Sequence, residues 1–486
     1  MPDASLSADE TAKGRGRKSS PRDNLLRVVL LSILFLVPCF WQSRIQAGDL
    51  SSHVYNVWLA SMISQGKING LWIAPQSTNV LFDLELEWLA RHVGWGAAQH
   101  IAVSLAVLIF VWGAIEFIFA AAGRNWWFAT PCVAILAYGF VYEIGFFNFY
   151  LSMGICLWYL AIFWHGSWRR RIAITLLLAL AWLAHPFPVV WAAGTAAYIA
   201  IAQRLRPRHR PLLFGFGLLT LLLTNYILIH RYRGRWFWKQ IFFVTGANQV
   251  VIYGTKYVFI LGALLFIWFV LLRKRAKEWG WAELVFSVPG QLWLLNAAAV
   301  LLIPSEVNFP TYALPFTYIT DRVSLAAALM GCVVLGSASV RLHEKIAMVA
   351  VASMFFSFLY IDTRELNRLE DGIDAAVKQL PAGQRVIASF PGWSKRMVPL
   401  RHDLDRACIG HCFSYANYEP SSRQFRIRAQ AGNAVVLDNY PDVEAVEEGR
   451  YVVKPRDLPL YEVFLCGPAR HDVCLSSLEA GKVVQR

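Results

Sequence analysis

The first residue whose type and position could support catalysis is an aspartate after the first apolar stretch. Asp49 precedes residues 50–62, where apolar residues recur at helical spacing, which predicts a helix lying on a membrane surface with one apolar face. His53 is one turn further along that face. An aspartate here can cap the helix, since its carboxylate accepts free amides of the first turn. It can also act as a general base that takes a proton from an attacking hydroxyl.

Further acidic and amide side chains stand among aromatic residues. Residues 82–88 read FDLELEW and contain Asp83 and Glu85. Carboxylates in such a setting can bind a metal ion or a sugar, or they can form the solvated face of a surface helix. Glu143 lies just before a second aromatic segment, GFFNFY, which contains Asn148, and the two side chains suit sugar recognition as well as an ordinary helix end.

Cationic candidates come from two places. Residues 230–239 read HRYRGRWFWK and carry Arg231, Arg233 and Arg235 beside aromatic side chains. Because arginine binds phosphate oxygens in a bidentate way, they predict a site for a lipid phosphate or diphosphate, with general attraction to anionic lipid as the alternative. Arg322 opens a later apolar stretch, where an ionisable residue is costly and indicates either function or an ion pair with its neighbour.

These candidates are connected by apolar segments. Of the 486 residues, 57% are hydrophobic and only 16% are charged, whereas soluble domains carry about a quarter charged residues. A membrane-spanning helix needs about 20 mostly apolar residues. About eleven stretches approach this requirement: 25–41, 98–121, 126–142, 146–164, 171–184, 187–202, 211–229, 257–272, 286–303, 321–339 and 345–360.

Basic residues give the orientation of these stretches. Residues 1–23 are polar, basic and expected to be disordered, and placing them in the cytoplasm puts nearly every basic cluster on that side. The net charge of +14 is therefore explained without nucleic-acid binding. The same orientation places a long first outer loop, 42–96, and residues 361–486 outside. The expected fold is an all-α polytopic membrane bundle over residues 24–360, followed by a small α/β extracytoplasmic domain.

Residues 361–486 differ in composition from the rest of the chain. We expect a helix over residues 362–380 and buried strands at 384–390 and 434–437. The domain contains an even number of cysteines: Cys408, Cys412, Cys466 and Cys474. In an oxidising compartment they predict two disulfides, with the pairing left open. Zinc binding is the alternative, although the spacing is not that of a standard zinc finger.

The membrane part resembles the GT-C superfamily of membrane glycosyltransferases. The resemblance is carried by the overall layout and by the segments AGDLSSHVYNVWLA, GFFNFYLSMGI and AHPFPVVW within residues 25–360. It implies a bacterial inner-membrane enzyme, with a cytoplasmic N-terminus and a periplasmic or extracellular C-terminal domain. Its donor would be a polyprenyl-phosphate sugar, and its acceptor a glycan, lipid or protein.

The resemblance also assigns a role to Asp49. The catalytic carboxylate of the family lies soon after the first span, which is the place of Asp49 here. Many members have a second acid beside it, whereas Asp49 is followed by Leu50, so no cofactor is implied with certainty and a divalent metal stays open. The candidate substrate-binding residues are His53, Asp83, Glu85, Glu143, Asn148, Arg231, Arg233, Arg235 and Arg322.

Two other functions compete with this interpretation. A transporter or flippase for lipid-linked glycans would need ionisable residues deep within the spans, where Glu116 and His185 are among the few present. A non-catalytic scaffold of an envelope polysaccharide system would need no catalytic residue. The sequence contains no Walker A, HExxH or GxSxG motif, so the nucleotide-binding and hydrolase classes that these motifs mark receive no support.

Overall fold

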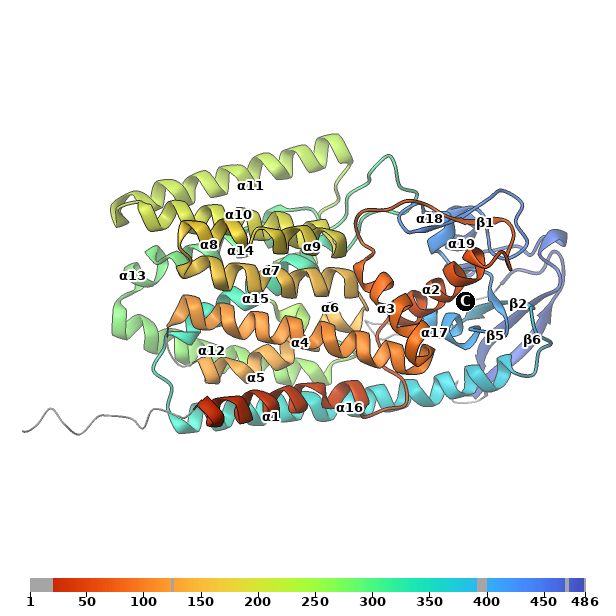
Figure 1. The fold of residues 1–486 in the computed structure, drawn as a ribbon, viewed down its shortest axis with the longest axis horizontal. Helices are drawn as coiled ribbons and strands as arrows, with labels where there is room; N and C mark the ends of the chain where they lie inside the picture. The colour runs from red at the N-terminus through yellow and green to blue at the C-terminus, as the bar shows by residue number, and fades with distance from the viewer. Residues whose placement is uncertain (1–20, 124–125, 391–399, 468–471, 485–486) are drawn as a thin grey trace, which may run out of the picture.

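The computed structural model describes residues 21–123, 126–390, 400–467 and 472–484 and is mostly helical (Figure 1). Residues 1–20, which make up most of the predicted disordered segment, lie outside this range. Every predicted apolar stretch is helical. The corresponding helices are α1 (Pro21–Phe40), α4 (Trp95–Ala122), α5 (Trp126–Ala137) with α6 (Phe140–Glu143), α7 (Phe147–His165), α8 (Trp168–Ala173) with α9 (Leu176–Ala184), α10 (Pro186–Arg204), α11 (Arg210–Tyr232), α12 (Lys256–Trp279), α14 (Val288–Leu302), α15 (Ile319–Gly336) and α16 (Leu342–Val377).

Six of the described helices are long and apolar enough to cross a membrane. They are α4, α7, α11 together with the short 3-10 turn η1 (Pro207–His209) before it, α12, α15 and α16. Helix α1, the pair α5–α6 and helix α14 contain shorter apolar stretches. The short helix α13 (Trp281–Phe286) links α12 to α14. The helices run side by side as a bundle, and the C-terminal domain lies at one end of it (Figure 1).

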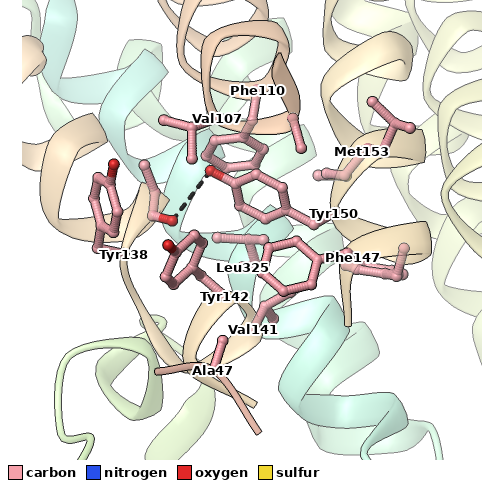
Figure 2. Packing of buried hydrophobic residues seen from close by; sticks show 14 of the residues in the cluster. Ala47, Val107, Phe110, Tyr138, Val141, Tyr142, Phe147, Tyr150, Met153 and Leu325 are labelled. Atoms are coloured by element: carbon pink, nitrogen blue, oxygen red, sulfur yellow. Dashed lines mark hydrogen bonds between the residues drawn. The ribbon is translucent and has the colours of Figure 1, made fainter. Parts of the chain in front are cut away.

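The centre of the bundle is held by close helix contacts and by aromatic packing. A Cβ at Gly113 of α4 would come 2.6 Å from the carbonyl oxygen of Gly154 in α7, so glycine allows the two backbones to approach. Beside this contact, Phe110 stacks on Tyr150, and the Tyr150 hydroxyl donates to the carbonyl of Ala137 over 3.1 Å (Figure 2). The buried cluster extends to Ala47, which lies in the segment that follows α1 (Figure 2).

The C-terminal domain begins as a continuation of the last long helix. α16 runs without a break through residues 362–377, which confirms the predicted helix there. A four-stranded sheet follows in the order β3-β2-β5-β6, formed by β2 (Arg385–Ser389), β3 (Phe413–Ser414), β5 (Leu460–Cys466) and β6 (Asp472–Leu478). Strand β2 pairs in parallel with β3 and β5, and β5 pairs antiparallel with β6. The other elements are α18 (Glu419–Ser422), α19 (Tyr440–Glu447) and the 3-10 turn η4 (Pro455–Asp457).

The strand predicted at residues 434–437 is wrong, because this segment is a series of bends. Two of its apolar residues, Val436 and Leu437, are buried as expected, each 1% exposed. The side-chain oxygen of Asn433, however, accepts from the backbone amides of Val435 and Val436, both over 2.9 Å. A local side-chain acceptor thus replaces the strand partner that these amides would otherwise need.

The first outer loop and the C-terminal domain form one structural unit. Strand β1 (Leu71–Ile73) of the loop pairs antiparallel with β4 (Ile427–Ala429), with Leu71 opposite Ala429. Helices α2 (Leu50–Ser64) and α3 (Leu81–Val93) complete the loop. Residues 50–60 of α2 are buried on every side, since α3 and α17 (Leu400–Ala407) pack around the helix. The prediction of an amphipathic helix lying on the membrane is therefore wrong.

The four cysteines of the C-terminal domain form two disulfides. Cys408 pairs with Cys412 and Cys466 pairs with Cys474, with S–S distances of 2.01 and 1.96 Å. The prediction of two disulfides is confirmed, and the pairing is now defined. Because these sulfur atoms are bonded to one another, none of them is a free thiolate for zinc.

Candidate functional site

A cavity of about 740 Å³ lies where the bundle meets the first outer loop and the C-terminal domain. Loop residues beside α2 form one wall, and residues from α7, α15, α17 and the 3-10 helix η2 (Trp238–Phe243) form others. Its charged and imidazole side chains are Asp49, His53, His185, Lys239, Glu306, Asp321, Arg322, His402 and Glu447. Aromatic rings, among them Phe146, Phe149 and Tyr418, line much of the remainder.

Backbone contacts fix the position of Asp49. Its amide donates to the carbonyl of Ile144 over 2.9 Å, and the Gly48 amide donates to the carbonyl of Glu143 over 2.8 Å. A Cβ at Gly48 would lie 2.7 Å from the Ile144 oxygen, and Gly145 packs against Asp49 with φ +88°. Gly48 and Gly145 therefore allow the backbone that carries Asp49 to lie directly against the end of α6.

The Asp49 side chain is free of the capping role considered from the sequence. Asp49 stands at the N-cap position of α2, yet its side chain makes no capping hydrogen bond. The carboxylate is 22% exposed and faces the cavity, and its Oδ1 lies 3.6 Å from Nε2 of His402. That distance is too long for a direct hydrogen bond, but the carboxylate and the imidazole are close neighbours at the cavity wall. The carboxylate is thus available for chemistry.

His53, Asp83 and Asn148 form a hydrogen-bonded chain beside the cavity. His53 Nδ1 lies 2.7 Å from Asp83 Oδ1, and the Asn148 amide donates to Asp83 Oδ2 over 3.0 Å. Asn148 also accepts from the backbone amide of Phe82 over 2.9 Å, which fixes its orientation. Although burial favours the neutral ring, the Asp83 carboxylate raises the pKa of His53 to about 9. His53 therefore carries positive charge at neutral pH.

A buried carboxyl group of α18 lies behind this chain. Burial raises the pKa of Glu419 to about 8, and the neighbouring His53 opposes the shift. The Ser52 hydroxyl is 3.4 Å from Glu419 Oε1. Glu419 and Asp83 both line a small pocket adjoining the main cavity. The C-terminal domain thus supplies a proton-holding group next to residues of the first outer loop.

Arg322 is held by aromatic rings with part of its guanidinium unused. Its guanidinium carbon lies 4.1 Å from the ring centre of Phe146 and 4.7 Å from that of Phe316. Nη1 donates to the carbonyl of Thr317 over 2.9 Å, whereas Nε is buried and has no hydrogen-bond partner among the described residues. Because Arg322 also lines the cavity, its guanidinium can bind an acceptor there.

The structure gathers only some of the predicted residues. Asp49, His53, Asn148 and Arg322 line the cavity, and Asp83 supports them from the adjoining pocket.

Glu143 and Glu85 do not line the cavity. Glu143 is buried and accepts from the Tyr253 hydroxyl over 2.5 Å, while burial in α3 raises the pKa of Glu85 to about 7.

The three predicted arginines of residues 230–239 also lie outside the cavity wall. Arg231, Arg233 and Arg235 are exposed, and Arg235 lies 3.7 Å from Glu306. The same segment reaches the cavity further on, through Lys239 and Gln240 of η2. The charged residues of the sequence identified this segment as a candidate. The direction of each side chain, however, depends on the turn of the chain at Arg233, whose φ is +50°.

Sequence reasoning missed His402, Tyr418 and the role of His185. His185 was considered only as one of the few ionisable residues within the spans. Its side chain accepts from the Phe187 amide over 3.1 Å and begins α10, while its ring lines the cavity. His402 lies in a polar segment of the C-terminal domain and gives no local signal of its role, because its partner Asp49 is far away in the sequence.

The chemistry available to this cavity follows from its own groups. No known family model, curated protein or solved structure matches the chain. The cavity offers carboxylates that can take up a proton, Asp49 among them, cationic groups that can hold an anion, and amide and aromatic side chains suited to a polar ring-bearing ligand.

Proposed function

We propose that the protein is a membrane glycosyltransferase of the GT-C type, which transfers a sugar from a polyprenyl-phosphate-linked donor to an extracytoplasmic acceptor. The main support is one observation: the Asp49 carboxylate and the incompletely bonded Arg322 guanidinium share one cavity at the end of an apolar helix bundle. A base and an anion-binding cation are what transfer of a sugar from a phosphate to a hydroxyl requires.

The proposed membrane arrangement has eleven spans. The six long apolar helices are joined by the shorter apolar helices, with the pairs α5–α6 and α8–α9 each counted as one span. Exposed apolar side chains support contact with lipid: α11 has no buried residue, and Leu212 and Phe216 are 74% and 66% exposed. The basic clusters then lie inside and the cavity outside, at the depth of lipid head groups.

In the proposed reaction, Asp49 acts as general base. The acceptor hydroxyl oxygen forms a bond to the anomeric carbon of the sugar while its proton moves to Asp49. The bond between that carbon and the phosphate oxygen breaks, and its electron pair stays on the polyprenyl phosphate. Arg322 and Lys239 line the same cavity and would stabilise the phosphate charge. A phosphate leaving group needs little help from an acid, so one base is sufficient.

The test is sugar transfer in membranes expressing the wild type, Asp49→Asn and Arg322→Ala. The donor is a pool of labelled polyprenyl-phosphate sugars, and both the product and the released lipid phosphate are measured. We expect Asp49→Asn to lose about 10²–10⁴-fold in kcat, the range that general-base catalysis supplies. Arg322→Ala should mainly weaken use of the donor.

The matched control is Asp371→Asn. This is the same substitution in α16, outside the cavity wall, where the side chain is 63% exposed. It should retain full turnover. Turnover that survives Asp49→Asn would exclude Asp49 as the base. Absence of transfer by the wild type with every donor would favour the transporter or the scaffold.

A further inference from the structure

Helix α17 is attached to α16, α4 and the first outer loop through polar contacts of Arg406, and the loop contact is to the carbonyl of Ile45 over 3.2 Å. Arg406 donates to both carboxylate oxygens of Glu370, over 2.6 and 2.7 Å, and to the side chain of Gln99 over 2.8 Å. Its side chain is only 8% exposed, and that of Glu370 is fully buried. Breaking such a buried pair costs about 3–5 kcal/mol, so α17 has a defined place against α16 and the loop.

Asp403, one turn before Arg406 in α17, is bonded to helix α2. Asp403 accepts from the Ser51 hydroxyl of α2 over 3.2 Å, and the backbone amide of Ser414 donates to Tyr55 of α2 over 2.9 Å. Together with the Arg406 contacts, these bonds hold α17 across α2 in one orientation. That orientation directs His402 at the first residue before α2, which is Asp49.

His402 lies between two carboxylates. Its Nε2 is 3.6 Å from Asp49 Oδ1, and its Nδ1 is 3.3 Å from Asp405 Oδ2. The His402 side chain is 12% exposed, whereas Asp405 is 4% exposed and lies behind it. The Tyr418 ring packs against the imidazole at 5.3 Å between ring centres. The order from the cavity inward is therefore Asp49, His402, Asp405, the arrangement in which one imidazole links an accessible carboxylate to a buried one.

We propose that His402 is a positioning residue that orients Asp49 and takes over the proton that Asp49 receives from the acceptor. This proposal rests on the proposed function. The step requires a carboxylate at Asp49 and an imidazole with a free Nε2 lone pair at His402. The acceptor proton passes to the Asp49 carboxylate while the new glycosidic bond forms and the lipid phosphate leaves, and it then passes to His402 Nε2 once the 3.6 Å gap between the two groups closes to hydrogen-bond distance in the substrate complex. Asp405 balances the resulting imidazolium charge, and the proton is finally lost to water. The C-terminal domain is then part of the reaction centre.

The charges that surround His402 come from several elements. The two in contact with it are Asp49 and Asp405; Asp403 and Arg406 lie on its own helix, Glu419 follows the Tyr418 ring that packs on it, and His53 and Arg322 line the same cavity. Because both nearest groups are carboxylates, a proton on His402 is held between two negative charges. The relay therefore makes turnover depend on pH through the protonation of this ring.

The experiment measures kcat and donor KM against pH for the wild type, His402→Gln and a control, His92→Gln. His92 is an exposed histidine of α3 that bonds only to the carbonyl of Trp88 in its own helix. We expect His402→Gln to lower kcat about 10–100-fold with donor KM within about 2-fold, the size of a modest general-base contribution. The part of the wild-type loss of rate at acid pH that comes from the imidazolium, which accepts no proton, should disappear in this variant, and only the part that comes from protonation of Asp49 should remain. The control should match the wild type.

A second variant separates the relay from a structural effect. His402→Ala should regain at least about 10-fold of its activity when imidazole is added, since a free base can occupy the vacated place. If kcat falls in His402→Gln while the full wild-type loss of rate at acid pH is retained, and if imidazole does not rescue His402→Ala, His402 has a structural role and the proposal is overturned. An unchanged kcat in His402→Gln, with Asp49→Asn inactive, would also overturn it while leaving the proposed function intact. If the wild type transfers no sugar, both the proposed function and the role proposed for His402 are overturned.

Discussion

Replacing Gly145 by alanine should displace Asp49 without touching its carboxylate. At φ +88°, an added Cβ would lie 2.9 Å from the Asp49 Cα and closer still to its amide nitrogen. Since non-bonded carbon atoms prefer about 3.5–4.0 Å, the backbone of Asp49 must move by about 0.5–1 Å. A misplacement near 1 Å can cost about 10²-fold in rate, so we expect kcat to fall about 10–100-fold.

The control for this change is Gly66→Ala. Gly66 also has positive φ, +69°, but a Cβ there meets nothing within 4 Å. Both variants carry the backbone cost of about 1–2 kcal/mol for a side chain in the left-handed region, and only Gly145→Ala displaces Asp49. Transfer rate and thermal midpoint are measured together in detergent. Equal transfer rates in the two variants would refute the link between the close approach at Gly145 and the placement of Asp49.

Three further predictions concern the C-terminal domain. Arg406→Ala leaves the buried Glu370 carboxylate without its closest cation, and should lower the free energy of unfolding by about 3 kcal/mol in denaturant titration. Burial raises the pKa of Glu419 from 4.5 to about 8, so the folded state binds this proton more tightly and the free energy of unfolding falls as pH rises across that interval; Glu419→Gln should flatten this dependence. Replacing both Cys466 and Cys474 by serine opens a loop closed over a separation of 8 residues and should lower the free energy of unfolding by about 2–3 kcal/mol. Reductant should then lower the thermal midpoint of the variant less than that of the wild type.

The helices and the disulfides were predictable because their signals are local. A long apolar run becomes a helix wherever backbone groups must find partners within their own segment. The continuous α16 was visible as an apolar stretch followed by an amphipathic one. The disulfides followed from the even number of cysteines placed on one side. The strand expected at residues 434–437 failed because Asn433 satisfies the local amides, a contact that apolar content does not report.

The candidate site was only partly predictable, since most of its contacts join distant segments. Asp49 was identified by its place at the start of a predicted helix soon after the first apolar stretch, and Arg322 because an ionisable residue at membrane depth is costly. The burial of α2 could not be foreseen: Ser51 and Ser52 look like a polar face, yet they contact Asp403 and Glu419 of the C-terminal domain. The same limit applies to the arginines of residues 230–239, because composition does not give the direction of a side chain.

The pairing of β1 with β4 also sets an order of events during synthesis of the chain. β1 ends at Ile73 and β4 begins at Ile427, so about 350 residues must be added before the two strands can meet. At about 5–20 residues per second, that interval lasts roughly 20–70 s. Throughout it, α2 lacks the α17 cover that buries it in the finished protein. A nascent chain therefore carries Asp49 long before it carries His402, and the proposed catalytic centre becomes complete only when biosynthesis is nearly over.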